Sequence, residues 1–551
     1  MAVRVCLPLA LASLLSACSG TIGGGGGEEC VNDSAEPAAG PSVITPTAGD
    51  LDVIPAALSM EVSAPVSEAG SHVATQFEIW RVVTTGPGER VWSAEVRDSS
   101  ALLSATLADG EFDWVAELTE LEDWEEYTVR ARYQTVDPEC SGDCCATWGL
   151  WSDDRQFRVT DRSPELFDNT VIRDINIEIA QPSWDAIDAE ARPPDCVPFT
   201  RDYHVGNVVV DGERFDGVGV RSKGGCGSAR HLNGKTAFKV NLSWDDPNVD
   251  GCPDTRRHRG LKRLTLNNMV QDSSFTHERI AYHFYGLMGV PVPRVAHVRV
   301  SVNGELWGLY LNVESIDRRM LTRNFQSNRG ALYEGTYWCD LLPENVPPAL
   351  EPNYCIQAKF KPNSCSSPKP GDDPLDYGPI RTLAEQIQAL PDGGFYPAIT
   401  NLMDWDTYLS LWAADAVLNH WDGYSFDIIN NYRVYHDPIA DRWTIIPSGV
   451  DQTLGNREVN PFVPQALLAN RCLSEPTCEA LFIARLTQAA DTFEQANLGA
   501  LATSIAAQIR ADVEADPRKE RSLQEFDDQQ VQLQNFIADR PDEIRAYINN
   551  H

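Results

Sequence analysis

The sequence predicts an α+β protein with two folded parts, an all-β sandwich followed by a larger domain in which strands and helices alternate. The first observation is a series of short alternating runs separated by turn clusters, from Leu51 to about Val159. The second is a change, beyond Pro164, to a mixture of alternating runs and segments with helical periodicity. The third is the length of 551 residues, which suits two to four domains of about 150 residues each.

The first fifty residues predict an export signal and a tether. Residues 1–17 contain an apolar run that is too short to span a membrane. The run ends in Leu15-Ser16-Ala17-Cys18, which resembles the lipobox of bacterial lipoproteins, so Cys18 is expected to carry a lipid anchor. Ser19 is typical of delivery to the outer membrane, which predicts an exported protein anchored at the outer membrane or cell surface. A simple cleaved signal is the alternative, and the Gly/Pro-rich residues 18–50 then form a tether.

The fourteen cysteines fit an exported protein. Without Cys6 in the signal and Cys18 at the anchor, an even set remains, which predicts disulfide bonds. Cys472 and Cys478 flank one short loop and are the first pair expected. Zinc is the rival hypothesis, but the chain has no pair of Cys-x-x-Cys motifs with histidine partners at zinc spacing. The even set is Cys30, Cys140, Cys144, Cys145, Cys196, Cys226, Cys252, Cys339, Cys355, Cys365, Cys472 and Cys478.

The net charge of −35 argues against a nucleic-acid partner, because no basic stripe interrupts the acidic chain. An acidic surface suits basic or cationic partners, although it also simply favours solubility. The acidic run from Asp245 to Asp250 raises calcium-dependent adhesion as a further hypothesis, but it lacks the spacing and terminal Glu of an EF-hand loop. The sequence indicates no oligomeric state.

Residues 51–160 are predicted to form the β-sandwich. Gln76–Trp80 and Tyr127–Tyr133 alternate apolar and polar side chains, as half-buried strands do. Together with Leu121, the pair Trp151-Ser152 and Phe157, this pattern resembles a fibronectin type III module. The resemblance implies a spacer or a docking surface.

Residues 165–551 are predicted to form the mixed domain, after a boundary at Asp161–Pro164. The Asn303-Gly304 pair predicts a tight hairpin, and Val290-Pro291 ends an amphipathic helix. The expected strands are 171–179, 203–210, 215–220, 235–242, 296–302, 307–313, 432–435 and 443–446, and the expected helices are 276–288, 405–418, 498–514 and 524–549.

A basic, glycine-rich segment stands out in this acidic domain. Arg221 to Arg230 carries Arg221, Lys223 and three glycines, and it leads into the alternating run Lys235–Leu242. Glycines let backbone N–H groups approach a phosphate, and the basic side chains supply charge. The segment therefore predicts an anion site, with a plain β-turn as the alternative.

Two carboxylates and an amide follow in a suggestive order near residue 420. The apolar helix 405–418 stops at Asn419-His420-Trp421-Asp422-Gly423, Asn431 lies shortly beyond it, and Asp451 follows a hairpin. Protein kinases use this order: a loop Asp accepts the substrate hydroxyl proton, and a later Asn and Asp bind metal.

These motifs, taken together, resemble the spore-coat protein H (CotH) family of atypical protein kinases from about Glu165 to the end of the chain. The resemblance implies a divergent kinase-like fold that transfers the γ-phosphoryl of ATP, with Mg²⁺ or Mn²⁺, to Ser/Thr hydroxyls of a protein substrate. The matching residues are Gly219-x-Arg221-x-Lys223-Gly224, Lys235-x-x-Phe238-Lys239, Leu264-x-Leu266-Asn267-Asn268, Glu278-Arg279-x-Ala281-Tyr282, Gly289-Val290-Pro291, Val302-Asn303-Gly304-x-x-x-Gly308-x-Tyr310-x-x-x-Glu314, Asn419-x-Trp421-Asp422-Gly423-Tyr424, Asn431-Tyr432-x-x-Tyr435, Pro447-x-x-x-Asp451 and Phe536-Ile537-x-x-Arg540.

Carried over from the family, Asp422 is the catalytic Asp, Asp451 a metal ligand and Asn431 a second metal ligand. Each has a structural alternative: a turn residue at 422, a cap at 451 and a strand-edge amide at 431. These alternatives stay open at this point.

The basic residues Arg221 and Lys223 are expected to bind the cofactor phosphates. Lys235 and Lys239 compete for a further phosphate contact, and a solvated lysine is the alternative. Glu278 or Glu314 is expected to pair with that lysine, and Glu278 is the better analogue because it lies in a helix, whereas Glu314 ends a strand.

One position departs from the family pattern, which has Trp-Asp-x-Asp where this chain has Ser448-Gly449-Val450-Asp451. The carboxylate missing at Gly449 predicts weakened metal binding if the family uses it as a ligand. This departure, and the scarcity of ATP outside the cytoplasm, motivate the alternative function: a non-catalytic surface lipoprotein that serves envelope assembly or adhesion.

Overall fold

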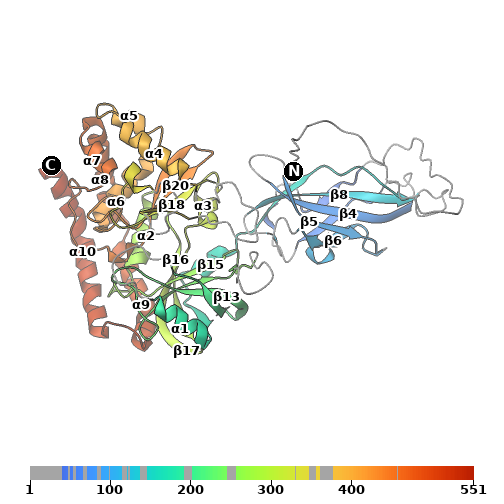
Figure 1. The fold of residues 1–551 in the computed structure, drawn as a ribbon, viewed down its shortest axis with the longest axis horizontal. Helices are drawn as coiled ribbons and strands as arrows, with labels where there is room; N and C mark the ends of the chain where they lie inside the picture. Colours follow the sequence, from blue (N-terminus) through green and yellow to red (C-terminus); the bar gives the residue numbers. More distant parts are fainter. Residues whose placement is uncertain are drawn as a thin grey trace, which may run out of the picture.

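The structure, a computed structural model, describes residues 40–551 except for 48–49, 54–57, 66–70, 83–87, 99, 114–120, 122–124, 137–145, 192–200, 245–255, 329, 347–354, 360–375 and 456. The predicted signal 1–17, the anchor at Cys18 and most of the tether lie outside the described residues, as does the acidic run 245–250. Figure 1 shows a β-rich N-terminal part and a larger part that mixes strands and helices.

The N-terminal part contains two sheets around one core. One has the strand order β1-β3-β6 and the other β2-β10-β8-β4-β5-β7, with β9 paired to β8. Phe77 and Ile79 of β4 and Val129 of β8 are fully buried in the shared core, so the predicted alternation at 76–80 and 127–133 is confirmed. The fibronectin type III assignment stays a prediction. The strands are β1 Val43–Thr45, β2 Asp50–Val53, β3 Ser59–Val62, β4 Ser71–Arg81, β5 Glu89–Val96, β6 Ser104–Thr106, β7 Glu111–Phe112, β8 Glu126–Val136, β9 Ala146–Trp148 and β10 Arg155–Val159.

A closed barrel opens the larger part, in the order β11-β12-β13-β14-β15-β17-β16. Apolar side chains such as Val220, Phe238 and Val240 fill its interior, so their neighbours Arg221 and Lys239 stand on the outer face. The predicted strands are confirmed with shifted ends. The elements are β11 Arg173–Glu178, α1 Gln181–Ala189, β12 His204–Val210, β13 Glu213–Lys223, β14 Ala237–Asn241, β15 Arg263–Asn267, β16 Val295–Val302 and β17 Glu305–Val313.

The rest of this part combines a second sheet, β19-β18-β20-β21, with helices. α6 spans Trp405–Leu418 as predicted and is buried on every side, which explains why its sequence is apolar throughout. The elements are α2 His277–Leu287, α3 Arg318–Asn324, β18 Leu332–Gly335, β19 Ile356–Ala358, α4 Gly378–Ala389, α5 Phe395–Ile399, β20 Tyr432–Asp437, β21 Arg442–Pro447, the 3-10 turn η7 Val450–Gln452, α7 Leu467–Leu473, α8 Pro476–Gln495, α9 Leu498–Ala515 and α10 Leu523–Asn550.

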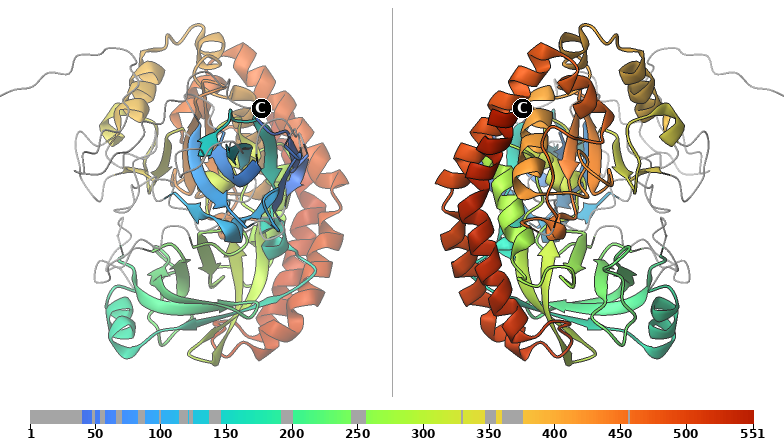
Figure 2. Two further views of the ribbon diagram at one scale, coloured as in Figure 1. Left: turned by 90° about the vertical axis from the view of Figure 1, so that its right-hand side faces the viewer. Right: turned by 90° about the vertical axis from the view of Figure 1, so that its left-hand side faces the viewer.

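The C-terminal helices connect the barrel to the rest of this part, the helical half, which contains the second sheet and the helices α3 to α8. α9 contacts β17 of the barrel, and α10 packs on α8 and α9. Figure 2 shows α9 and α10 running along one side of the barrel and of the helical half. In the described part of the chain, none of the helices has the length and apolarity to cross a membrane.

Two disulfides lie in the helical half. Cys472–Cys478, the pair expected first, is confirmed, and Cys339–Cys355 is a second. Cys226 is also disulfide-bonded. The other seven cysteines of the even set lie outside the described residues.

Candidate active site

The loop that carries Asp422 begins where α6 ends. Asn419 ends the helix in the left-handed conformation, with φ 54°. The fully buried Arg540 of α10 donates to the last carbonyls of α6, Ala416 at 2.7 Å and Val417 at 3.1 Å, and to Asn419 Oδ1 at 2.6 Å. A guanidinium is thus the C-terminal cap of α6. This contact gives the Phe536-Ile537-x-x-Arg540 motif its physical role.

Asp422 is 6 % exposed, and two amides hold one of its oxygens. Asn431 Nδ2 donates to Oδ2 at 2.9 Å and Gln452 Nε2 at 3.3 Å. Oδ1 has no hydrogen-bond partner among the described residues. Burial and the nearby Asp451 raise the pKa of Asp422 to about 6, although His420 acts in the opposite direction.

The buried His420 lies beside Asp422, and the sequence patterns did not indicate it as a site residue. Its Nδ1 lies 2.9 Å from the Tyr285 hydroxyl and 3.3 Å from Asp415 Oδ1, and its Nε2 lies 3.6 Å from Asp422 Oδ1. Burial lowers the pKa of His420, but Asp415 and the other carboxylates outweigh it, so the pKa is raised overall. A polar residue two positions before a candidate catalytic Asp, in the same loop, was the signal that could have found it.

Asp451 lies on η7, which packs against α2 and so comes close to Glu278. Both oxygens of the buried Glu278 accept from Asn267 Nδ2 at 2.9 Å. Burial and Asp451 raise the pKa of Glu278 to about 8, while Lys223 opposes them. Burial also raises the pKa of Asp451, and Lys223 again opposes it. Lys223 is therefore the cation that Glu278 and Asp451 share.

A group of cations faces these carboxylates. Arg221 of β13 pairs across the ladder with Lys239 of β14, and Lys223 lies two residues further along the same face. Burial and the charges of Arg221, Lys223 and Arg433 hold the pKa of Lys239 well below its usual range. Arg433 of β20, which forms an ion pair with Glu334, lies close enough for its charge to act on Lys239. A polyanion would relieve this repulsion.

The structure places Lys235 outside this group. Its ammonium forms a 2.6 Å ion pair with Asp516, and both side chains are buried. Lys235 therefore fastens the end of α9 to the barrel, which corrects its prediction as a phosphate ligand. Of the two lysines left open by the sequence, Lys239 is the one beside Arg221 and Lys223.

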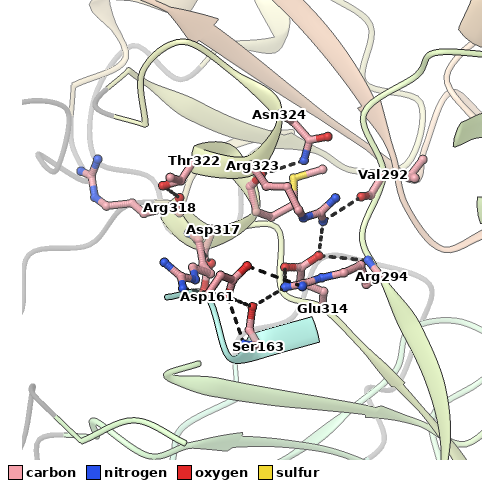
Figure 3. A network of polar contacts seen from close by, with 12 residues as sticks. Asp161, Ser163, Val292, Arg294, Glu314, Asp317, Arg318, Thr322, Arg323 and Asn324 are labelled. Carbon is pink, nitrogen blue, oxygen red and sulfur yellow. Dashed lines mark hydrogen bonds and ion pairs between the residues drawn. The ribbon is translucent and has the colours of Figure 1, made fainter. Parts of the chain in front are cut away.

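Glu314 also lies elsewhere, in the network of Figure 3. It pairs with Arg294 at 2.6 Å and with Arg323 of α3, and it is 3 % exposed. Asp161, in the predicted boundary segment, joins the same network through Arg294, at 3.9 Å. Glu314 thus connects the boundary segment to β17 and α3, so the prediction that it pairs with a phosphate-binding lysine is wrong. The pairing of Glu278 with Lys235 or Lys239 stays a prediction.

Gly449 lies against Asn431. It adopts the left-handed conformation with φ 59°, and a Cβ added there would stand 2.5 Å from Asn431 Oδ1. The side chain of Asn431 therefore occupies the space beside position 449. Gly449, the residue that departs from the family pattern, is thus in close contact with Asn431, a candidate metal ligand.

The residues that could hold a cation are Asn431 and Asp451, with Asp422 beside Asn431. Within the described ranges, no three His, Cys, Asp or Glu side chains form a metal-binding group. Two carboxylates and an amide do gather: Asp422, which has an unpartnered oxygen, Asn431, which touches it, and Asp451, whose charge raises the pKa of Asp422. Oxygen donors that repel one another suit Mg²⁺ or Mn²⁺.

Comparisons with known proteins show the family of the chain. The family model described as "CotH kinase protein" matches residues 220–544. The chain is 22 % identical over 197 residues to the inner spore coat protein H of Bacillus subtilis (strain 168), which is 36 % of this chain and 51 % of that protein. It is 36 % identical over 56 residues to an inner spore coat protein H-like protein of the same organism, 10 % of this chain and 18 % of that protein. The chain thus spans about half the length of the first relative and less than a fifth of the second.

Proposed function

Since the chain belongs to the CotH kinase protein family, we propose that it is an atypical protein kinase. It transfers the γ-phosphoryl of ATP to a Ser or Thr hydroxyl of an envelope or surface protein. The observation that carries this proposal is the hydrogen-bonded pair Asp422–Asn431, with the charge of Asp451 acting on Asp422, and a group of cations, Arg221, Lys223 and Lys239, in a chain of net charge −35.

In this proposal Asp422 accepts the proton of the acceptor hydroxyl through Oδ1. Asn431 and Gln452 hold the other oxygen, so the free oxygen is oriented before the acceptor binds. A carboxyl group with a pKa of about 6 is mostly ionised at pH 7 and is a stronger base than an ordinary Asp. Arg540, by capping α6, keeps this loop in place.

Arg221, Lys223 and Lys239 bind the phosphates in this proposal. Phosphoryl transfer depends mainly on positioning and on neutralising charge, so cations fixed on two paired strands suit it. Glu278 lies close enough for its charge to raise the pKa of Lys223, and in this proposal the two pair as a helix Glu and a strand Lys do in protein kinases. Asp451 and Asn431 would hold Mg²⁺, which when bound neutralises phosphate oxygens.

The kinase-like fold belongs to the same proposal. A strand lysine, a helix glutamate, a loop carboxylate after a buried helix and a carboxylate after a hairpin follow one another in the kinase order, at Lys223, Glu278, Asp422 and Asp451. A closed seven-stranded barrel supplies the lysine strand here.

The setting of the activity is proposed from other observations. The names of the two relatives refer to the inner spore coat. The disulfides Cys339–Cys355 and Cys472–Cys478 favour an oxidising compartment, in line with export and a lipid anchor at Cys18. Proteins of the envelope or surface are therefore the proposed substrates.

A non-catalytic role in envelope assembly or adhesion is the second candidate, and Gly449 favours it. If the family uses a carboxylate at this position to bind metal, the chain lacks one ligand. Such a protein would keep the fold and the cation group without transferring phosphate.

Incubation of the purified protein with γ-labelled ATP, Mg²⁺ or Mn²⁺ and a basic acceptor protein separates the two candidates. The kinase proposal predicts labelling of the protein or the acceptor by wild type and its loss in Asp422→Ala. Equal labelling by wild type and variant would remove the kinase assignment. Absence of labelling and of ATP binding with either metal would leave the non-catalytic role.

A further inference from the structure

The turn after β18 bridges the two sides of the candidate active site. On the barrel side, the Tyr337 hydroxyl is hydrogen-bonded to the backbone of Cys226 in the glycine-rich segment. A Cβ on Gly225 would stand 2.8 Å from that hydroxyl, so only glycine allows this approach. On the other side, Trp338 N donates to Ile428 O at 2.8 Å, in the loop between Asp422 and Asn431.

Covalent and hydrogen bonds fix this turn. Cys339 is buried and disulfide-bonded to Cys355 at the start of β19. Thr336 donates to Cys355 O from both N and Oγ1 at 3.0 Å. The buried Tyr432, which follows Asn431, donates its hydroxyl proton to Cys339 O. The position of Tyr337 is therefore set by a disulfide and by the chain next to Asn431.

The Tyr337 hydroxyl also lies close enough to Asp422 and Asp451 for their charges to act on it. Burial raises the pKa of Tyr337, and the charges of Asp422 and Asp451 add to this effect. The segment that Tyr337 touches continues directly from Lys223, the cation shared by Glu278 and Asp451. A shift of the turn would thus move the glycine-rich segment that follows Lys223 relative to the loop that carries Asp422.

We propose that Tyr337 is a positioning residue that holds the glycine-rich segment 224–230 against the Asp422 loop, and that the Cys339–Cys355 disulfide fixes Tyr337 in this task. ATP phosphates then bind at full affinity only when both the Tyr337–Cys226 hydrogen bond and the Cys339–Cys355 disulfide are present. The inference rests on the proposed function for its ATP readout, whereas the positioning of the segment is tested without nucleotide.

The first test replaces Tyr337 by Phe, which removes the hydroxyl and keeps the ring. Amide hydrogen exchange of the nucleotide-free protein should speed up at Cys226 by about five-fold, the factor expected for one lost hydrogen bond, with no change in α9 or α10. The KM for ATP should rise by a similar factor while kcat changes little, because Tyr337 does not touch reacting atoms. Unchanged exchange at Cys226 would overturn the proposal.

The second test removes the disulfide through the double variant Cys339→Ser/Cys355→Ser. It should speed exchange at Cys226 and raise the KM for ATP as Tyr337→Phe does. Adding Tyr337→Phe to the double variant should change little further, because both act through one contact. The matched control is Cys472→Ser/Cys478→Ser, which removes a disulfide between α7 and α8.

The outcomes separate this inference from the proposed function. If the wild-type protein binds no ATP but amide hydrogen exchange at Cys226 is faster in Tyr337→Phe, the kinase proposal is refuted and the positioning role of Tyr337 is supported. Additive effects in the combined variant, or equal effects in the Cys472/Cys478 control, would show that the disulfide acts through general stability and would overturn the role assigned to it.

Discussion

Asn431 Nδ2 donates a hydrogen bond of 2.9 Å to Asp422 Oδ2, and the Oδ1 of the same amide is 2.5 Å from the place of a Cβ on Gly449. One amide thus links the loop after α6 to the turn after β21. Because the second contact requires the absence of a side chain, the glycine at 449 and the asparagine at 431 belong together.

Gly449→Ala should therefore lower the unfolding free energy by more than the strain of a left-handed backbone at a non-glycine residue. The strain of the positive φ costs about 1 kcal/mol, and the clash with Asn431 should add roughly 1–3 kcal/mol. Chemical denaturation measures the sum. Gly217→Ala is the matched control, because Gly217 has φ 64° and nothing lies within 4 Å of its Cβ position. Equal losses in both variants would contradict the close contact with Asn431.

Lys235 and Lys239 should respond in opposite ways to substitution by Met. Lys235→Met leaves Asp516 buried without its cation and should cost roughly 3–5 kcal/mol of unfolding free energy. Lys239→Met removes a charge that is repelled by Arg221, Lys223 and Arg433, so stability should hold or rise while ATP binding weakens. Denaturation and calorimetric titration with magnesium-ATP give the two readouts. Weaker ATP binding in a fully stable Lys235→Met would reverse the assignment.

Arg540→Ala should unfold the end of α6 and disturb the loop that holds Asp422. The variant removes three buried hydrogen bonds and should cost roughly 3 kcal/mol. Arg545→Ala, in the same helix but on the surface, is the control and should cost less than about 1 kcal/mol. Loss of activity with unchanged exchange at the α6 C-terminus would argue against the capping role.

The pH dependence follows from the raised pKa of Asp422, about 6. Since the folded state binds this proton more tightly than the unfolded state, the unfolding free energy of the metal-free protein should fall as pH rises from about 4 to 6. Asp422→Asn should remove that part of the slope, whereas Asp392→Asn, at an exposed carboxylate, should not. Phosphoryl transfer should decline as the pH falls below about 6, because the protonated acid is no base. A slope that survives in Asp422→Asn would contradict the assignment.

Much of the fold could be predicted from local patterns. The helix 405–418 and the hairpin at Asn303-Gly304 are encoded by periodicity and turn chemistry, and both are confirmed. The expected strand 215–220 ends before Arg221, whereas β13 continues to Lys223 and its antiparallel register places Arg221 opposite Lys239. Strand ends were less predictable: β14 begins at Ala237, two residues after Lys235.

The partners of the lysines and glutamates could not be predicted, because they come from distant segments. Lys235 lies 281 residues from Asp516, and no local pattern relates them. Glu314 ends a strand as expected, but its partner Arg294 makes it part of a network that reaches Asp161. Only the tertiary structure shows that Asp451 of η7 and Lys223 of β13 lie close enough to Glu278 for their charges to act on it.

The most direct measurement of the central claim is a crystal structure with Mn²⁺ and a non-hydrolysable ATP analogue, with the metal located by its anomalous signal. The account predicts a manganese peak at the oxygens of Asp451 and Asn431, with the γ-phosphate between Lys223 and Asp422. A nucleotide bound elsewhere, or a manganese peak remote from Asp422 and Asp451, would contradict it.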